Sequence, residues 1–285
     1  MKISIVIPAY NEARTIFQTV SGLRSMYPEM EIIVVNDGSS DNTSEEAARA
    51  GAYVVNHPYN IGNGAAVKTG IRRASGDIVI LMDGDGQHDP NDIKALLEHA
   101  SSYDLVVGAR DGHGQASMAR RVANWCFNKL ASYVAKFEIQ DLTSGFRIFH
   151  RKEVLKYLYL FPNTFSYPTT STLSYIRSGL TIKYVPIQVR KRAGDKSKIR
   201  ILEDGFRFII IILRIATICS PLRIFLPLSL IFFMLGGGYY CYTYLAFHRF
   251  TTMSMLLFSV SVMIFLMGLI SDQIAQMRFD RLENS

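Results

Sequence analysis

The sequence predicts an α/β fold, with helices on both faces of a mostly parallel sheet, followed by a membrane-anchoring tail. Two observations predict it. Through the first 110 residues, short runs rich in Val and Ile alternate with helical stretches, which is typical of a parallel sheet. After residue 220 the chain carries two apolar segments of the length that a bilayer requires.

The expected strands are Ile3–Ile7, Ile32–Val35, Tyr53–Val55, Ile78–Met82 and Leu105–Val107. The expected helices between them are Ala13–Met26, Ser44–Ala50, Ala65–Ala74 and Asp92–Ala100. Ligands of such sheets bind beyond the carboxyl ends of the strands. Polar residues follow these ends at 8–12, 36–41, 83–89 and 110, so we expect the functional site there.

Short elements over residues 146–187 are expected to complete the first domain. A helix over residues 114–137 precedes them, because apolar residues recur there at helical spacing. Trp125 and Tyr133 belong to this apolar series. We therefore expect both side chains to pack on the sheet.

The tail begins with a basic run over residues 190–200. Residues 206–220 are very apolar but include Arg207 and Arg214, and are too short to cross a bilayer, so we expect a helix in the interface. Two spans, 222–247 and 253–274, then form a hairpin because the connection is short. The expected organisation is a catalytic domain over 1–198, juxtamembrane helices over 199–220, and the hairpin with a short tail over 221–285.

Composition limits the classes of partner and compartment. The 285 residues carry a net charge of +7, and only 19% of them are charged. The sequence contains no RNA- or DNA-binding motif, so the basic excess indicates a membrane surface or a phosphorylated substrate rather than nucleic acid. The three cysteines form neither a metal-binding pattern nor a disulfide framework, which favours a reducing compartment.

Basic residues flank the hairpin at both ends and are fewer in its turn. The charge distribution therefore predicts an integral membrane protein whose catalytic domain and both termini are cytoplasmic, in a bacterial or archaeal inner membrane.

The strongest chemical signal is Asp83-Gly84-Asp85-Gly86-Gln87, directly after an apolar strand. Two carboxylates two residues apart can share one divalent cation, and Gln87 can add a neutral oxygen. Hard oxygen ligands suit Mg²⁺ or Mn²⁺. Such a cation would neutralise the diphosphate of a leaving nucleotide. An acidic turn without metal is the alternative for this segment taken alone.

Three further segments carry polar or glycine residues, two directly after expected strands and one in a glycine-rich stretch. In Pro8-Ala9-Tyr10-Asn11-Glu12 and Asn36-Asp37-Gly38, Asp37 can accept from the N–H of a base and Glu12 from ribose hydroxyls. In Asn60-Ile61-Gly62-Asn63-Gly64, the glycines permit close backbone approach and the later Lys68 supplies charge near phosphates. Each segment alone is equally consistent with a simple turn.

Taken together, these motifs resemble glycosyltransferase family 2, which has the GT-A fold. Within it the chain is similar to the dolichol-phosphate mannose synthase and bacterial polyprenyl-phosphate glycosyltransferase subgroup. Two later motifs support this subgroup, Asp141-Leu142-Thr143-Ser144-Gly145-Phe146-Arg147 and Arg192-Ala193-Gly194-Asp195-Lys196-Ser197-Lys198. The resemblance covers about residues 1–200, and the paired membrane helices continue it.

The resemblance implies roles for individual residues. The metal ligands would be Asp83, Asp85 and Gln87. The nucleotide-sugar site would contain Pro8, Tyr10, Glu12, Asp37, Gly38, Gly62, Lys68 and Asp83. The acceptor phosphate would be held by Arg110, Arg120, Arg121, Asn124, Arg192, Ser197 and Lys198. The catalytic set would be Asp83, Asp85, Arg110, Arg120, Asp141 and Arg147. Asn124 stands where the family often has serine, so its role departs from the pattern.

These roles imply inverting transfer of a single hexose from a nucleotide-sugar to a polyisoprenyl phosphate, with a UDP-sugar favoured over GDP-mannose. One alternative is a lipid hydroxyl acceptor, which would need Asp141 or Asp89 as a base. Another is an inactive nucleotide-sugar-binding regulator of a membrane assembly. Whether Asp141 acts as a base or orients Arg147 stays open, as does homo-oligomer formation. The basic run is also consistent with binding anionic lipid headgroups.

Overall fold

The computed structural model describes residues 1–110, 118–164, 166–188 and 220–283. The chain divides into two compact units, and each is described by itself. The first unit covers residues 1–132 and 137–205 and contains an α/β domain. The second covers residues 133–136 and 206–285 and contains the two long C-terminal helices.

A seven-stranded sheet forms the centre of the first unit, in the order β3-β2-β1-β4-β6-β5-β7. The strands are β1 Ile3–Ala9, β2 Glu31–Asn36, β3 Tyr53–Asn56, β4 Ile78–Leu81, β5 Leu105–Arg110, β6 Arg147–His150 and β7 Ile182–Ile187. Neighbouring strands are parallel except at β6, which is antiparallel to both β4 and β5. The mostly parallel sheet is confirmed, and β6 places the motif that contains Asp141 in the middle of it.

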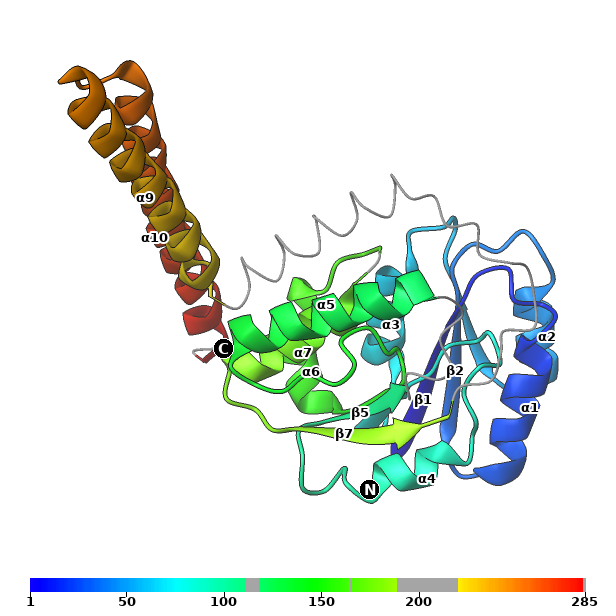
Figure 1. The fold of residues 1–285 in the computed structure, drawn as a ribbon. Helices are drawn as coiled ribbons and strands as arrows, with labels where there is room; N and C mark the ends of the chain where they lie inside the picture. The colour runs from blue at the N-terminus through cyan, green and yellow to red at the C-terminus, as the bar shows by residue number, and fades with distance from the viewer. Residues whose placement is uncertain (111–117, 165, 189–219, 284–285) are drawn as a thin grey trace. The chain divides into compact units, whose positions relative to one another are not determined.

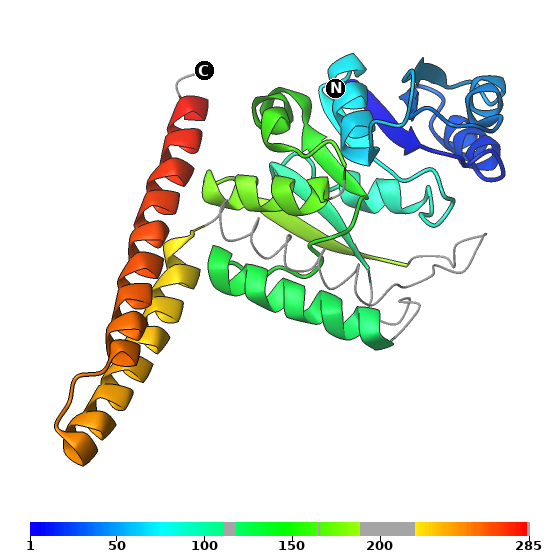
Figure 2. The same ribbon diagram turned by 90° about the horizontal axis from the view of Figure 1, so that it is seen from above.

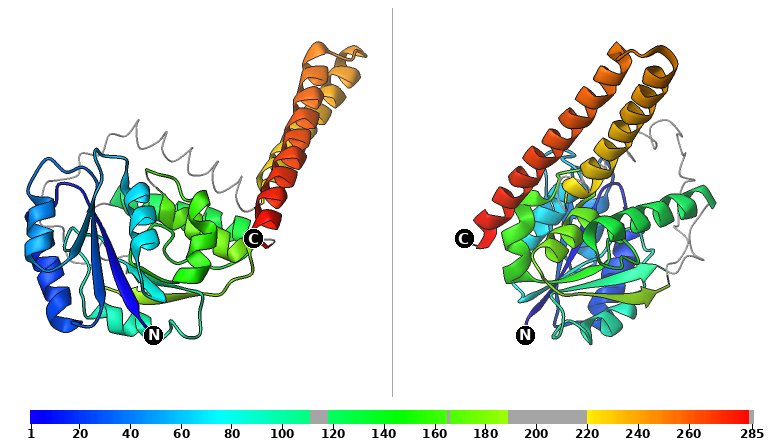
Figure 3. Two further views of the ribbon diagram at one scale, coloured as in Figure 1. Left: turned by 180° about the vertical axis from the view of Figure 1, so that it is seen from behind. Right: turned by 60° about the vertical axis from the view of Figure 1, so that its left-hand side comes forward.

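Helices cover both faces of this sheet, as expected. They are α1 Ile16–Met26, α2 Thr43–Arg49, α3 Asn63–Arg73, α4 Asp92–Leu97, α5 Met118–Ala135, α6 Arg151–Tyr157 and α7 Tyr167–Arg177. Figures 1 and 3 show α1 and α3 on opposite sides of β1 and β2. Ile5 and Ile7 of β1 join the α1 side chains in one buried cluster, while Val6 lies against α3. Burial on both faces explains the continuous apolar runs of these strands.

The expectation that Trp125 and Tyr133 pack on the sheet is wrong. Trp125 is 61% exposed and Tyr133 is 59% exposed, whereas Ala131 and Val134 are buried. At 3.6 residues per turn, Trp125 and Tyr133 lie on the side of α5 opposite to Ala131 and Val134. Among its described side chains, α5 therefore buries a narrower stripe than its apolar series suggested.

The second unit is a hairpin of α9 Leu222–Phe247 and α10 Thr252–Glu283, which run side by side in Figure 2. Each contains a 26-residue segment that is long and apolar enough to span a membrane, with mean hydropathy 1.7 and 2.4. The first expected segment coincides with α9, and the second helix continues past residue 274. The expected interfacial helix over 199–220 lies outside the described residues, apart from Ser220.

Small and polar residues hold the two hairpin helices together. The Ser229 and Ser261 hydroxyls lie 3.2 Å apart, and Ser261 Oγ also donates to the Ser229 carbonyl at 2.9 Å. At Gly268, an added Cβ would lie 2.6 Å from the Cβ of Phe225. In a bilayer, lipid tails are as apolar as the leucines and phenylalanines of these helices, so burial of apolar side chains does not drive the helices together. Close packing and hydroxyl pairing then fix the pairing of α9 with α10.

One pair of glycine substitutions tests the packing of α3 on the sheet. A Cβ at Gly70 would lie 2.2 Å from Val6 Cγ1, whereas a Cβ at Gly22 in α1 would meet nothing within 4 Å. Gly70→Ala should destabilise the domain by about 1–3 kcal/mol through overpacking. Gly22→Ala should instead stabilise it by roughly 0.5–1 kcal/mol through helix propensity. Thermal unfolding of the detergent-solubilised chain measures both, and equal shifts for the two variants would contradict the close packing.

Candidate active site

A cavity of about 350 Å³ lies where the carboxyl ends of β1, β2 and β4 meet. This volume is in the range of small-molecule pockets. Among its lining residues are most of those expected to bind a nucleotide-sugar and metal, namely Pro8, Tyr10, Glu12, Asp37, Gly62, Asp83 and Asp85. Gly38, Lys68 and Gln87 are not on its walls. Segments far apart in the sequence are therefore brought together as the strand-end pattern predicted.

The loops after β1 and β2 brace each other beside this cavity. Asn11, in the left-handed region with φ 56°, donates its N–H to Ser39 Oγ at 3.0 Å and accepts from the N–H of Ser40 at 2.9 Å. The N–H of Glu12 donates to Thr43 Oγ1 at 2.9 Å. The polar residues of these two motifs thus shape the loops and need not all contact a ligand.

Asp37 is buried and serves largely as an acceptor for the protein's own donors. It accepts from His57 Nδ1 at 2.7 Å, from the N–H of Ile61 at 3.1 Å and from the N–H of Gly62 at 2.8 Å. His57 Nε2 lies 2.9 Å from Thr69 Oγ1. Asp37 therefore fixes the 61–62 segment as well as lining the cavity. Sequence reasoning missed His57, although its position one residue after β3 places it at the same edge of the sheet.

Gly62 and Gly64 lie against another segment of the chain, residues 162–164, and do not face an open phosphate site. A Cβ at Gly64 would lie 2.0 Å from the Pro162 carbonyl oxygen, and one at Gly62 would lie 2.7 Å from that of Asn163. The N–H groups of Gly64 and Ala65, at the start of α3, donate to the carbonyls of Thr164 and Asn163 at 2.9 and 2.7 Å. The expected anion site at this helix start is therefore not supported by the geometry.

Two other expected nucleotide-site residues also have structural partners. Lys68 donates to the Phe161 carbonyl at 3.2 Å and to Asn163 Oδ1, so it ties α3 to the 161–163 segment. Its pKa is lowered, chiefly because burial disfavours the charged form and secondly because Arg72 is near. Gly38 has φ 69°, and a Cβ there would lie 2.4 Å from the backbone of Tyr59. Both contacts favour loop-shaping roles over direct ligand contact.

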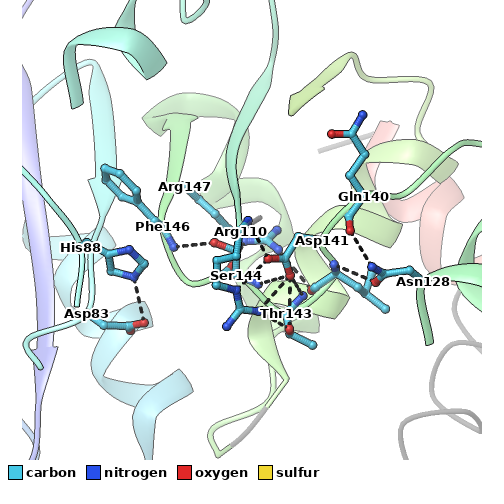
Figure 4. Close-up of polar contacts among 11 residues, drawn as sticks. Asp83, His88, Arg110, Asn128, Gln140, Asp141, Thr143, Ser144, Phe146 and Arg147 are labelled. Carbon is cyan, nitrogen blue, oxygen red and sulfur yellow. Dashed lines mark hydrogen bonds and ion pairs between the residues drawn. The ribbon is translucent and has the colours of Figure 1, made fainter. Parts of the chain in front are cut away.

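The aspartate pair follows β4 on a loop with defined support. Thr15 Oγ1 donates to the Gly84 carbonyl at 2.9 Å, and the N–H of Gln87 donates to Asp85 Oδ1 at 3.1 Å. A Cβ at Gly145 would lie 2.7 Å from Asp83 Oδ2, so glycine is required where the 141–147 turn meets this carboxylate. Asp83 lies 3.5 Å from His88 Nε2, whose ring packs on Phe146 with centroids 5.0 Å apart (Figure 4).

The carboxylate oxygens of Asp83 and Asp85 fit a divalent cation whose other ligands come from the substrate and from water. Within the described residues, no three His, Cys, Asp or Glu side chains gather as a closed metal cage. Mg²⁺ is usually held by one or two carboxylates together with substrate phosphates and water, and Asp83 and Asp85 share a cavity wall that offers this arrangement. Gln87 is not on that wall, so its part in metal binding stays a prediction.

Arg110, at the end of β5, is held in a dense polar cluster (Figure 4). Its Nε donates to Asp141 Oδ2 at 2.8 Å, and its Nη2 donates to Asp141 Oδ1 at 3.0 Å and to Thr143 Oγ1 at 2.5 Å. Burial alone would raise the pKa of Asp141, but the hydrogen bonds and charge of Arg110 hold that pKa below its ordinary value. This bidentate geometry fixes the direction of the guanidinium.

Of the two open roles for Asp141, the geometry favours neither. Its oxygens accept from Arg110 and from the N–H groups of Thr143 and Ser144, and its lowered pKa makes it a poor base. Arg147 has no hydrogen bond to it among those described. Arg147 is fully buried and donates to the Ser144 carbonyl, Ser171 Oγ and Thr172 Oγ1 at 2.6, 3.0 and 2.7 Å. These contacts show Arg147 supporting the 141–147 turn, and its catalytic role stays a prediction.

The remaining acceptor-site predictions fall outside what the structure describes. Arg120, Arg121 and Asn124 lie on α5, but their side chains are not described. Arg192, Ser197 and Lys198 lie outside the described residues. Their roles stay predictions, and Arg110 is the member of this set with described contacts.

Comparisons with known proteins agree with this arrangement. The family description "Glycosyl transferase family 2" matches residues 4–158, and "GtrB C-terminal hairpin" matches residues 220–277. An undecaprenyl-phosphate mannosyltransferase of Micrococcus luteus is 28% identical over 70% of this chain and 87% of the relative. A dolichyl-phosphate beta-glucosyltransferase of Trichomonas vaginalis is 27% identical over 69% of this chain and 68% of the relative.

A dodecaprenyl-phosphate galacturonate synthase of Rhizobium johnstonii is 30% identical over 55% of this chain and 49% of the relative. Among solved structures, glucosyl-3-phosphoglycerate synthase from Mycobacterium tuberculosis, in complex with Mn²⁺, UDP-glucose and phosphoglyceric acid, superposes with a TM-score of 0.62. The sequences are 24% identical, and the match covers 76% of this chain and 79% of the other, which shows a shared fold. Because the first family match spans more than half of the chain, the chain belongs to glycosyltransferase family 2 and has a GT-A-like fold.

Proposed function

We propose that the chain transfers one hexose from a nucleotide-sugar to a polyisoprenyl phosphate with inversion at the anomeric carbon, and that a UDP-sugar is favoured over GDP-mannose. The observation that carries the proposal is the pair Asp83 and Asp85 on the wall of a cavity that also holds Tyr10, Glu12 and Asp37. Three relatives bear names that join a polyprenyl or dolichyl phosphate to a sugar, which supports the acceptor class.

The nucleoside would occupy the wall formed by the β1 and β2 loops. Tyr10 is 48% exposed there, which suits a ring that stacks on a base. Glu12 would accept from ribose hydroxyls. Asp83 and Asp85 would hold Mg²⁺ or Mn²⁺, which when bound would neutralise the diphosphate as it leaves. A structural neighbour was solved with Mn²⁺ and UDP-glucose, which supports this assignment.

The acceptor phosphate would be gripped by Arg110, whose guanidinium is already oriented by Asp141. One phosphate oxygen attacks the anomeric carbon from the side opposite the diphosphate. A new carbon–oxygen bond forms, the bond to the diphosphate oxygen breaks, and the nucleoside diphosphate leaves. A phosphate monoester has a second pKa of about 6, so the nucleophile is mostly a dianion at neutral pH. The protein then contributes positioning and charge neutralisation and needs no base.

The site geometry also bears on the alternative acceptor. A lipid hydroxyl would require a base within hydrogen-bond reach. Asp141 is engaged by Arg110, and its pKa is lowered, so it fits that task poorly. We infer that the catalytic unit works at the cytoplasmic membrane surface, where the α9–α10 hairpin anchors it and basic residues flank the spans.

Loss of a metal-binding carboxylate should abolish transfer. The detergent-purified chain with Mn²⁺, a polyprenyl phosphate and a panel of radiolabelled UDP- and GDP-sugars should yield label in the organic phase from one donor class. Asp85→Ala should reduce that label by roughly 10²-fold or more, because the cation that neutralises the developing diphosphate charge would lose a ligand. A chelator should do the same.

Asp89→Asn is the matched control on the same loop. Asp89 Oδ1 accepts from the N–H and Nδ2 of Asn91 at 3.0 and 2.8 Å, and asparagine can keep one such contact. Its transfer rate should stay near that of the unaltered chain. Strong loss in Asp89→Asn, together with label on a diacylglycerol, would favour the hydroxyl-acceptor alternative. Absence of any labelled product with intact donor binding would favour the regulator.

Arg110→Lys should weaken acceptor recognition more than donor recognition. Lysine keeps the charge but loses the fork that engages Asp141 and presents a donor to phosphate. We expect KM for the polyprenyl phosphate to rise about tenfold or more, with KM for the donor nearly unchanged. Asp141→Asn should produce the same asymmetry, because Arg110 would lose its orienting partner. An equal rise in both KM values would contradict the acceptor role.

The acidic limb of the pH–rate profile should report the acceptor. The pKa of Asp141 is lowered in the folded state, so the stability that its ion pair contributes is present above its unfolded pKa and is lost only as pH falls through the lower folded value. The pair therefore stays ionised near neutrality. Rates should fall below about pH 6 as the phosphate gains a proton. If Asp141→Asn moves this limb, the limb belongs to a protein group instead.

A further inference from the structure

The hydroxyl of Thr15 makes a contact that its place in the chain does not predict. Thr15 is the residue before α1, where a threonine side chain normally accepts a hydrogen bond from an N–H group of the first helical turn. No such bond forms among the described residues of this turn. Thr15 Oγ1 instead donates to the carbonyl of Gly84 at 2.9 Å, across 69 positions of sequence. The start of α1 therefore goes without this cap, and the hydroxyl serves another segment.

The bond to Gly84 is the shortest of three contacts that this hydroxyl makes. The carbonyl oxygen and Oε2 of Glu12 lie 3.3 and 3.4 Å from Thr15 Oγ1. A hydroxyl has one hydrogen to donate, so the Gly84 carbonyl at 2.9 Å is its best-placed acceptor. Thr15 is only 9% exposed, so water has little access to replace this bond. Thr15 thus stands between Glu12, which is expected at the ribose, and the loop that carries the aspartate pair.

The loop after β4 meets Thr15 through its glycines and the cavity through its carboxylates. Asp83 and Asp85 line the cavity, whereas Thr15 is not on its walls. The Gly84 carbonyl accepts from Thr15, and a Cβ at Gly86, which has φ 72°, would lie 3.8 Å from Thr15 Cβ. The start of α1 therefore supports this loop at alternate residues, from outside the cavity.

We propose that Thr15 is a positioning residue that holds Asp85 in place for a metal ion bound together with the nucleotide. The inference rests on the proposed function and concerns how the metal-binding carboxylates within it are held. The Gly84 carbonyl and the Asp85 N–H belong to one planar peptide unit, so a hydrogen bond that fixes the carbonyl also fixes where Asp85 begins. Glycine on both sides of Asp85 would otherwise leave the backbone free to take several conformations. Groups that orient metal ligands in this way govern metal affinity without touching the metal.

Nucleotide binding with and without Mn²⁺ measures this role apart from turnover. Calorimetry on the full detergent-solubilised chain compares UDP, and in a parallel series GDP, in Mn²⁺ and in chelator. The gain in nucleotide affinity that Mn²⁺ confers reports the metal site. Thr15→Val keeps the shape of the side chain but removes the hydroxyl, so this gain should fall about three- to tenfold, the usual worth of one hydrogen bond. Affinity in chelator should not change. Thr15→Ser restores the donor and should restore the gain.

Thr19→Val is the matched control on the same helix. Thr19 is similarly buried, but its hydroxyl donates to the Thr15 carbonyl within α1 at 3.0 Å. This variant should keep the full Mn²⁺ gain. Thermal unfolding identifies a merely structural bond, which would lower the Tm of Thr15→Val and leave the Mn²⁺ gain intact. If Thr15→Val does not fold, Thr15→Ala removes the hydroxyl without adding bulk and should show the same loss of gain.

The outcomes separate the inference from the function on which it rests. If neither nucleotide binds with Mn²⁺ and no lipid product forms, the proposed function fails, and the inference fails with it. If nucleotide binds and lipid product forms, but the variant without the hydroxyl keeps the full Mn²⁺ gain, the positioning inference fails and the proposed function stands. An equal loss in Thr19→Val, or a loss that Thr15→Ser does not restore, would overturn the inference in the same way.

Discussion

The carboxylate of Asp141 is the contact on which the geometry of the site depends. It joins the end of β5, through Arg110, to the turn that precedes β6. That turn sets Gly145 against Asp83 and places Thr143 beside Arg110. If either partner of this ion pair moved away, the other would be left as a buried charge without compensation. The pair therefore holds the 141–147 turn and the Arg110 guanidinium in place together. One carboxylate thus positions groups beside both Arg110 and Asp83.

The charges of the site are arranged in sequence along the proposed reaction path. Asp83 and Asp85 form an acidic end that suits a cation and the diphosphate it would bind, whereas Arg110 forms a basic end whose charge is balanced by Asp141. A balanced arginine attracts a phosphate less strongly than a free one, but it costs less to keep buried. The basic run over residues 190–200 would then supply further positive charge for a phosphate at the membrane surface.

Much of the fold was predictable because parallel strands buried on both faces have strong apolar signals. Positions of β1 to β5 and of α9 followed directly, and so did the meeting of Tyr10, Asp37 and Asp83 at one edge. Side-chain partners were not predictable. Asp141 pairs with Arg110 because β6 inserts antiparallel between β4 and β5, and nothing in the local sequence specifies that order. Likewise, Gly62 and Gly64 accommodate residues 162–164, which lie about a hundred positions later.

The hairpin bears on how tightly the proposed site must bind the acceptor phosphate. Only 11% and 17% of an apolar 18-residue stretch in α9 and α10 is buried, which suits helices that lipid covers. The Ser229 and Ser261 hydroxyls satisfy each other inside it, which avoids leaving a polar group in hydrocarbon. Under the proposed function, anchoring would confine the catalytic unit to the surface where a polyisoprenyl phosphate presents its head group. The resulting effective concentration would reduce the affinity that Arg110 and its neighbours must supply.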